Sequence, residues 1–270
     1  MRKRLIYLLF FLSVFSYAKG ADNLRLADTR TLGLGGSGAV YSPMFNPALT
    51  AFYARRQVRA DYFDRYALKE LGTLSGGLCM PNPILPFGVH IASFGYDKYR
   101  ESLFRLSVAK RLSRIWSIGV SVQYNLLQSE LFERSGARLS ADLGVALRPT
   151  DEWMFGLSVI HFPSVSTGSD EVNDTYLASL KIVSGLRYVV AEGMELSVGG
   201  EYRRDEPFVF SVGMEYAAFA DFRLRAGVRS SPFSPSLGAC YSFIGLTLDT
   251  AILYHSTLGT SIGCGLSYTF

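Results

Sequence analysis

The sequence lacks any long apolar run after its first residues, and this absence argues against membrane-spanning helices. Such a helix needs about 20 consecutive, mostly apolar residues, and no stretch beyond residue 18 provides them. The 270-residue chain is nonetheless 49% hydrophobic and contains 16 Tyr and 19 Phe. These residues are spread over short segments in which they alternate with polar or small ones, instead of gathering in a few core elements.

Histidine and cysteine are also scarce, with three of each, so few residues are available for catalysis or metal binding. Asp249 and His255 fall on one face of a predicted strand but lie six residues apart, or about 20 Å. His161 precedes an acidic loop, 170–174, that lacks the regular ligand spacing of a calcium loop. We therefore predict no catalytic residue, no metal site and no cofactor, and an outer-membrane hydrolase is the least favoured function. The three cysteines are expected to be wall-filling residues without disulfides.

The chain carries almost no net charge once residues 1–18 are left out. Arg2, Lys3 and Arg4 precede the apolar run Leu5–Phe15, and small residues follow, which predicts a signal peptide over 1–18. The chain has 27 Lys+Arg and 23 Asp+Glu, so removing three bases leaves 24 against 23, a net charge of +1. The composition therefore gives no reason to expect nucleic-acid binding. Export past the inner membrane predicts the outer membrane of a Gram-negative cell as the location.

The alternation of apolar and small or polar residues continues to the last residue and predicts an all-β protein. In the segment 259–270, Ile262, Leu266 and Tyr268 share one face, whereas the other face carries small or polar residues. This pattern is typical of a strand between lipid and a lumen. Strands in lipid cannot leave an edge unpaired, so they must close into a barrel. The sequence predicts a 14-stranded antiparallel transmembrane β-barrel over 57–270. The predicted strands are 57–66, 69–80, 86–96, 101–112, 115–127, 137–148, 153–162, 176–190, 194–204, 208–217, 222–230, 236–243, 246–255 and 259–270.

The connections between these strands agree with a barrel whose two termini are periplasmic. The longest two, Gln128–Gly136 and Pro163–Thr175, are both predicted to be extracellular, whereas the periplasmic turns are short. Aromatic residues gather at both ends of the strands, as in the interfacial girdles of membrane proteins. Outer-membrane lipids are therefore the expected surroundings of the outer face.

The segment 19–56 does not alternate, and we predict that it folds inside the lumen as a plug or hatch. It carries the glycines Gly33, Gly35, Gly36 and Gly38, which permit close approach of backbones. A phosphate-binding loop is rejected because no βαβ unit surrounds these glycines and no Lys-Ser/Thr ending follows them. Further along, Asn46 and Pro47 predict a turn or helix start that leads into the first strand.

These residues also carry a resemblance to a known family. The stretch 32–39 reads Leu-Gly-Leu-Gly-Gly-Ser-Gly-Ala and is followed at 45–48 by Phe-Asn-Pro-Ala. This arrangement ahead of a barrel resembles the start of the PorV/PorQ family, which is similar to the wider group of FadL-type outer-membrane barrels. The resemblance implies 14 strands and an N-terminal hatch. PorV/PorQ members are linked to type IX protein secretion and surface attachment, whereas FadL-type members pass hydrophobic molecules.

Charged residues on the inward faces of the strands allow two interpretations. The favoured one is a solvated, internally paired wall that holds the plug. The other is an anion-attracting conduit, because Arg residues outnumber acids and three of them share one strand face. The lumen-facing charges that we single out are Arg105, Asp142, Glu201, Glu215, Arg223, Arg225 and Arg229.

Two functions of different class therefore follow from the sequence. The first is a non-enzymatic scaffold or accessory component of an outer-membrane complex, with another outer-membrane or secreted protein as its partner. The alternative is a FadL-like transporter of hydrophobic or small anionic solutes. A lateral gap in the wall would favour transport, and Pro86, Gly88 and Gly95 around the third strand are where we expect a kink.

Overall fold

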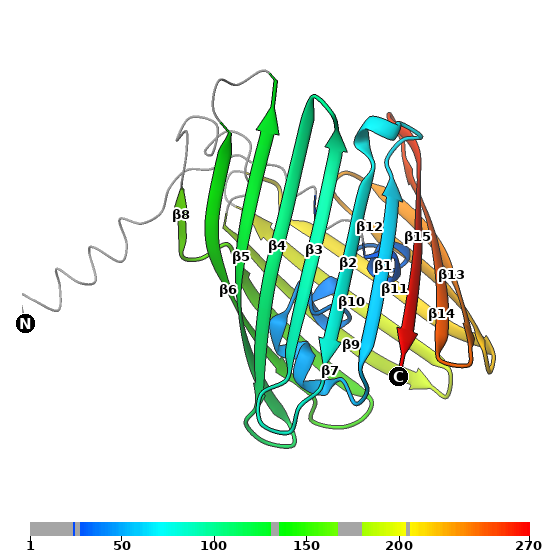
Figure 1. The fold of residues 1–270 in the computed structure, drawn as a ribbon. Coiled ribbons are helices and arrows are strands. Elements are labelled where there is room, and N and C mark those ends of the chain that lie inside the picture. Colours follow the sequence, from blue (N-terminus) through cyan, green and yellow to red (C-terminus); the bar gives the residue numbers. More distant parts are fainter. Residues whose placement is uncertain (1–23, 25–27, 131–134, 167–179, 204–205) are drawn as a thin grey trace, which may run out of the picture.

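The computed structural model shows an open-ended cylinder of strands around a short N-terminal segment (Figure 1). No helix in the part of the chain that the structure describes is long and apolar enough to cross a membrane. The predicted signal peptide, 1–18, lies outside the described residues and stays a prediction. The described residues are 24, 28–130, 135–166, 180–203 and 206–270.

The strands of the described residues form a single antiparallel sheet, and fourteen of them close into a barrel. Each strand pairs with its neighbour in sequence, and the barrel closes where β1 (Gln57–Asp64) pairs with β15 (Gly259–Thr269). The prediction of a 14-stranded antiparallel barrel is therefore confirmed, and the strand bounds agree with the expected ones to within a few residues. The other barrel strands are β2 (Thr73–Met80), β3 (Phe87–Tyr96), β4 (Tyr99–Arg111), β5 (Trp116–Ser129), β6 (Gly136–Leu147), β7 (Trp153–Ile160), β9 (Lys181–Ala191), β10 (Met194–Arg203), β11 (Val209–Phe219), β12 (Phe222–Arg229), β13 (Ser234–Phe243) and β14 (Leu246–His255).

A fifteenth strand, β8 (Ser164–Ser166), lies in the connection 163–175, which was predicted to be an extracellular loop after the strand 153–162. The extended backbone breaks at His161, which has a φ of 61°. The His161 N–H donates to Asp142 Oδ1 at 2.9 Å instead of to a strand carbonyl. Beyond this break β8 pairs with β6 again. A second difference is that Lys69–Leu71 forms a 3-10 helix (η4), so β2 begins later than expected.

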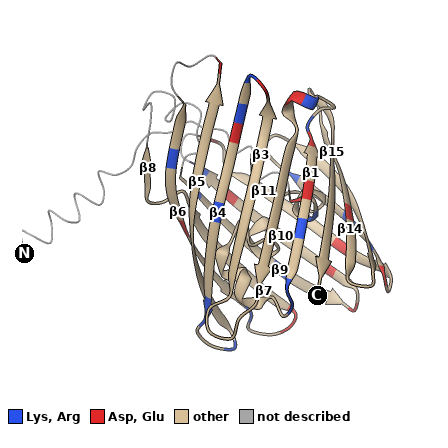
Figure 2. Ribbon diagram, viewed as in Figure 1, with Lys and Arg blue, Asp and Glu red and all other residues tan. Residues whose placement is uncertain are grey.

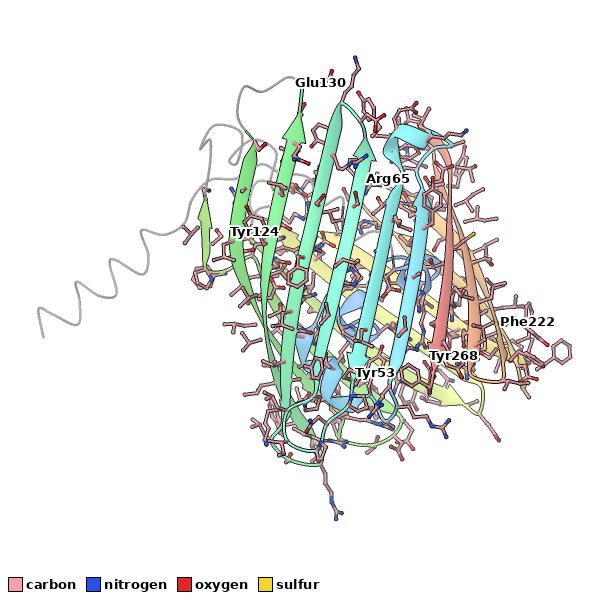
Figure 3. The ribbon with its side chains drawn as sticks, viewed as in Figure 1. Tyr53, Arg65, Tyr124, Glu130, Phe222 and Tyr268 are labelled. Atoms are coloured by element: carbon pink, nitrogen blue, oxygen red, sulfur yellow. The ribbon has the colours of Figure 1, made fainter. Side chains whose placement is uncertain are left out.

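Side chains alternate between the two faces of the wall, as the sequence predicts. On β5 the outward Ile118 and Val120 are exposed, whereas the inward Ser121 and Gln123 are buried. Charged residues are sparse along the strands (Figure 2), and Phe222 projects away from the barrel (Figure 3). An outward apolar face with an inward polar face is the arrangement of a barrel that stands in lipid.

The two ends of the barrel differ in their connections. The C-terminus lies at the end where short turns join the strands (Figure 1), and short turns are periplasmic in barrels of this type. An aromatic cluster stands near this end, with the rings of Trp153 and Tyr188 4.3 Å apart. We call the opposite end, where β1 ends at Asp64 and β9 begins at Lys181, the extracellular end.

The N-terminal segment, residues 28–56, lies inside the barrel (Figure 1). It contains α2 (Thr29–Gly33) and two 3-10 helices, η2 (Gly38–Val40) and η3 (Pro47–Phe52). The Asn46 side chain caps η3 by accepting a hydrogen bond from Ala48 N, and Pro47 follows the cap. The helix start expected at these two residues is therefore present. Caps of this kind satisfy backbone N–H groups that the helix itself leaves unpaired.

Candidate functional site

The inner wall carries one ring of glycines at the level of the N-terminal segment. The glycines sit opposite one another across strand pairs, as Gly119 does with Gly144, and Gly156 with Gly185. We call this ring the glycine belt; its members are Gly119, Gly144, Gly156, Gly185, Gly199, Gly213, Gly227, Gly238 and Gly263. It provides a groove around much of the lumen in which another backbone can lie against the wall.

The N-terminal segment occupies this groove. A Cβ atom added at Gly119, Gly144, Gly156, Gly213 or Gly227 would lie less than 3.0 Å from an atom of the segment. The contacts run in order around the barrel, from Leu32 at β15 through Leu34 at β11 and Ala39 at β7 to Ala48 at β5. The segment therefore follows the inner wall from β15 round to β5, and glycine is the residue that makes such an approach sterically possible.

The side chain of Asn46 joins the segment to the wall at the end of this path. Its Nδ2 group donates to Ala39 O at 3.1 Å and to Val145 O at 3.0 Å. The Asn46 side chain is fully buried, and its Oδ1 atom is the cap of η3. A single amide thus ties two turns of the segment to β6, which explains why a short polar side chain is required at this position.

A ladder of ion pairs runs along the inner face of the wall and joins β1, β14, β12 and β11. Arg59 on β1 contacts Asp61 Oδ2 at 2.6 Å and Asp249 Oδ2 at 3.2 Å. Arg225 on β12 contacts Asp249 Oδ1 at 2.5 Å and Glu215 Oε2 at 2.6 Å. The charges therefore alternate in sign across four strands, and each buried carboxylate is compensated by an arginine.

The N-terminal segment adds its own charges to this ladder. Arg30 donates to both carboxylate oxygens of Glu215, at 3.1 and 3.2 Å. The backbone N–H of Thr29 donates to Asp61 Oδ1 at 3.0 Å, and Asp28 lies 3.9 Å from Arg59. The start of α2 is thus anchored to β1 and β11 by charge-assisted hydrogen bonds.

A second buried polar cluster joins the segment to β4, β5 and β6. Arg105 forms an ion pair with Asp142 at 2.9 Å and donates to Ser121 Oγ at 2.8 Å. It also donates to the carbonyls of Pro43 and Met44 in the segment. Two arginines therefore fasten the N-terminal segment to the wall: Arg30 of the segment, near its start, and Arg105 of β4, which binds near its middle.

The seven lumen-facing charges singled out from the sequence all lie on inward positions and all form ion pairs. Glu201, for example, lies 3.1 Å from Lys181 and 3.6 Å from Arg229. Arg223 is the least buried of the seven, with its side chain 48% exposed and 3.6 Å from Glu215. This pairing favours an internally neutralised wall over an anion-attracting conduit. Gly33, Gly35 and the other predicted plug residues line the path along the belt.

Two residues and the belt glycines play parts that the sequence reasoning missed. His161 precedes the acidic loop in the sequence, but it is buried, with Nδ1 2.6 Å from Gln123 Nε2. Tyr66, an aromatic residue at a predicted strand end, lines a cavity and packs edge-on against His255. The belt glycines carry a visible signal, which is their recurrence at inward positions of successive strands.

We expect Arg105→Met to destabilise the barrel strongly. The substitution removes the Arg105 cation that lies 2.9 Å from the buried Asp142, and breaking a buried pair in this way costs about 3–5 kcal/mol. The control is Arg223→Met, whose side chain is 48% exposed and whose partner Glu215 keeps Arg30 and Arg225, so that its loss costs at most about 1 kcal/mol. Urea-induced unfolding in lipid vesicles, followed by tryptophan fluorescence, measures both. Equal losses for the two variants would show that the Arg105 cluster is not a structural anchor.

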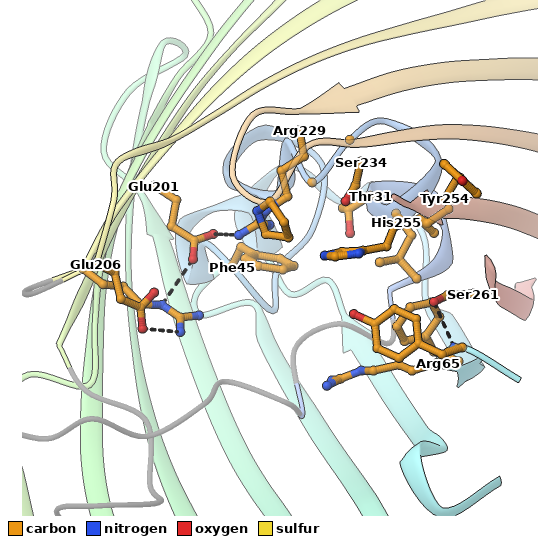
Figure 4. Close-up of a pocket in the computed structure, with 18 of the residues that line it drawn as sticks. Thr31, Phe45, Arg65, Glu201, Glu206, Arg229, Ser234, Tyr254, His255 and Ser261 are labelled. Carbon is orange, nitrogen blue, oxygen red and sulfur yellow. Dashed lines mark hydrogen bonds and ion pairs between the residues drawn. The ribbon is translucent and has the colours of Figure 1, made fainter. Parts of the chain in front are cut away.

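Two cavities remain in the lumen beside the segment. The larger, which we call the outer cavity, has a volume of about 310 Å³ and opens among strand ends at the extracellular end (Figure 4). Its apolar surface comes from residues such as Phe45, Phe63 and Leu253. Its charged residues are Arg65, Lys181, Arg203, Arg229, Glu201 and Glu206.

The smaller cavity, which we call the inner cavity, has a volume of about 120 Å³. It lies between the segment and β1–β4 and reaches toward the periplasmic end, where Gln57 and Cys79 line it. Tyr41, Met44 and Tyr53 of the segment form its other side. The two cavities are separated by the start of α2 and its contacts with β1.

The wall around the expected kink is continuous. β3 pairs with β4 over its whole length and with β2 from Phe87 to Phe94, and the Gly95 N–H donates to Gly72 O at 3.1 Å, so Gly88 and Gly95 do not interrupt the sheet. The interruption lies instead after β7, at His161. In the described ranges, no group of three or more His, Cys, Asp or Glu residues is placed to hold a metal ion.

Comparison with known proteins relates the chain to channels of the outer membrane through the fold alone. No family model and no curated protein matches the sequence. Among solved structures, the CymD monoaromatic hydrocarbon channel superposes with a TM-score of 0.66 at 15% identity, covering 90% of this chain and 97% of that one. The Pseudomonas putida toluene transporter TodX gives 0.63 at 11% identity, covering 94% and 99%. A Pseudomonas aeruginosa FadL homologue gives 0.59 at 14% identity, covering 90% and 98%.

These similarities bear on the expectations from the sequence in different ways. The FadL-like fold with an N-terminal segment ahead of the barrel agrees with the resemblance noted above. None of these matches names the PorV/PorQ group, so that finer assignment and its link to secretion stay predictions.

Proposed function

We propose that this protein is a FadL-like outer-membrane channel that passes small hydrophobic compounds. The observation that carries the proposal is the outer cavity, a space of about 310 Å³ with both apolar and charged lining residues, held open above the N-terminal segment inside a closed barrel. Ligand sites of channels and carriers are concave and mostly apolar, with a few polar groups that orient the ligand. The solved structures with the same fold include a monoaromatic hydrocarbon channel, CymD, and a toluene transporter, TodX.

The arrangement of charge supports a hydrophobic solute better than a small anion. Glu201 in the outer cavity is surrounded by three cations, of which Lys181 is 3.1 Å and Arg203 3.2 Å away. An anion would have to compete with this carboxylate for the same cations. An uncharged solute can use the apolar surface of Phe45, Phe63 and Leu253 without breaking an ion pair.

The proposal predicts that filling the outer cavity blocks uptake. Leu253 points into the cavity, whereas its neighbour Ile252 is 51% exposed on the outer face. Leu253→Trp is therefore expected to lower toluene uptake about tenfold, because an indole takes up much of the apolar space, and Ile252→Trp is expected to leave it within about twofold. Uptake of radiolabelled toluene by a host strain that lacks its own hydrocarbon channels measures the effect.

The uptake experiment distinguishes the proposed transport function from the scaffold function. If the wild-type chain gives no uptake above the empty strain, the transport proposal is wrong. Recovery of a stoichiometric outer-membrane or secreted partner with the tagged protein would then favour the scaffold that the sequence resemblance implies. Equal uptake by Leu253→Trp and wild type would show that the solute does not pass through the outer cavity.

A further inference from the structure

We propose that the outer face of the barrel carries a binding site for an anionic phospholipid at its periplasmic end, where Lys110 and Arg114 hold the lipid phosphate. The site lies outside the lumen, on the end of β4 and on the turn that joins β4 to β5. The inference depends on the outer-membrane location of the barrel and is independent of the proposed transport function. Four features of this end of the barrel support it.

The first feature is the position of Lys110 in a row of lipid-facing side chains. It follows Leu106 and Val108 at every second residue of β4, and it pairs with Ile118 on β5. Along the strands that the structure describes, Lys110 is the one charged residue at an outward position near the periplasmic end. A charge on the lipid face is unfavourable unless it reaches the headgroups. The position of this lysine therefore indicates an anionic group at the membrane surface.

The second feature is the gathering of uncompensated positive charge at this end. The charges of the lumen are paired, as Arg105 is with Asp142. At the periplasmic end, by contrast, five basic residues take part in no ion pair within the described ranges: Arg55, Arg56, Lys110, Arg111 and Arg114. The connections 81–86 and 112–115 contain no Asp or Glu. Anionic lipid headgroups are attracted to basic residues placed at a membrane surface in this way.

The third feature is the apolar surface next to the two cations. Leu112, Ile115 and Trp116 flank Arg114 in the sequence, and all three are large and exposed. Tryptophan rings at a membrane boundary lie at the level of the headgroups. A phospholipid has the matching combination, because its charged phosphate stands directly above apolar chains.

The fourth feature is a set of hydrogen bonds that fixes the turn and the lysine. Ser113 Oγ accepts from the backbone N–H groups of Ile115 and Trp116, both at 3.1 Å. Lys110 Nζ donates to Ile84 O at 2.9 Å, which ties the lysine to the β2–β3 connection. An ammonium group has three N–H donors, so two remain for a phosphate. The site is therefore largely formed before a lipid binds.

The surroundings of Lys110 favour a lipid over an acidic protein segment as the occupant. Lys110 lies between Val108 and Leu112 on the face that the membrane covers, so a protein would have to displace lipid to reach it. The acidic residues Asp151 and Glu152 lie on a different connection of the same end, between β6 and β7. This unequal distribution of charge around the rim directs an anionic lipid to β4 and β5.

The two tryptophans of the chain provide a direct test. Trp116 lies at the site, whereas Trp153 lies at the same end of the barrel, directly after the acidic pair 151–152. Trp153→Phe leaves Trp116 as the single fluorophore, and Trp116→Phe leaves Trp153. Each variant is reconstituted in phosphatidylcholine vesicles with brominated phosphatidylglycerol or brominated phosphatidylcholine at the same mole fraction. We expect the brominated anionic lipid to quench Trp116 about twofold more strongly, and the two lipids to quench Trp153 equally.

A pair of matched double variants identifies the residues that bind the lipid. In the Trp153→Phe background, Lys110→Gln/Arg114→Gln is expected to abolish the preference for the anionic lipid at Trp116. Lys69→Gln/Arg100→Gln removes two positive charges at the extracellular end and is expected to keep the preference. Heat-modifiable migration in gel electrophoresis checks that every variant forms a barrel.

Three results would overturn the lipid site. The first is equal quenching of Trp116 by the two lipids in the Trp153→Phe protein. The second is a preference that survives Lys110→Gln/Arg114→Gln or that disappears in both double variants, because the net charge of the barrel would then be its cause. The third is retention of poly-glutamate by the barrel, lost in Lys110→Gln/Arg114→Gln, without any lipid preference. That result would assign the basic turn to an acidic protein segment instead.

Discussion

Removal of residues 21–50 is expected to turn the barrel into an ion-conducting pore. The described part of this stretch lies inside the lumen and fills the space along the glycine belt. A barrel of 14 strands encloses more space than its own inward side chains occupy. Without the segment, that space admits water and ions, and we expect the conductance in planar lipid bilayers to rise about tenfold or more over the wild type.

The shortened barrel should still fold, because the wall retains most of its own ion pairs. Glu215 loses Arg30 but keeps Arg225 at 2.6 Å. Asp61 loses the Thr29 N–H but keeps Arg59. Heat-modifiable migration in gel electrophoresis checks that the variant forms a barrel before its conductance is measured. A folded variant with unchanged conductance would show that the segment does not close the lumen.

The architecture was predictable because period-two alternation is a local property of the chain. The apolar residues of each barrel strand identify its outward face, as Ile118 and Val120 do on β5. The short periplasmic turns then fix the order and the antiparallel pairing. The pairing of β8 with β6 beyond His161 was missed because a residue with positive φ in the left-handed region leaves no distinct signal when it is not glycine.

The functional interior was only partly predictable, for a physical reason. Alternation shows which side of the wall Arg105 or Glu215 faces. The ion-pair partner of each residue depends instead on the stagger between strands and on the path of the N-terminal segment. The pairing of Arg30 with Glu215 joins residues 185 positions apart. The glycine belt was missed for the same reason. A glycine in a strand suggests a bulge or the close approach of another group, but it does not indicate which segment of the chain approaches.

The choice between channel and scaffold rests on where free space remains. A scaffold needs only a closed wall and a suitable rim, and a fully packed lumen would serve it well. This lumen instead keeps an outer and an inner cavity, separated by the start of α2 and its contacts with β1. Such spaces reduce packing and therefore stability, so their presence along one route favours passage of a solute.

A side chain introduced into the glycine belt is expected to have an effect nearly as large as removal of the segment. At Gly156 an added Cβ would overlap the carbonyl of Ala39, and Gly156→Val adds two further methyl groups at that point. The wall cannot yield easily, because Gly156 is held in register with both neighbouring strands, β6 and β9. The segment must therefore leave the groove, and we expect conductance to rise toward that of the shortened barrel.

The matched control for this substitution is Gly76→Val on β2. A Cβ there has no neighbour closer than 3.6 Å, so the strand accepts it at little cost. Single-channel recordings and heat-modifiable migration of both variants in parallel separate an opened lumen from a misfolded barrel. If Gly156→Val folds and stays closed, the segment can shift within the lumen without opening it.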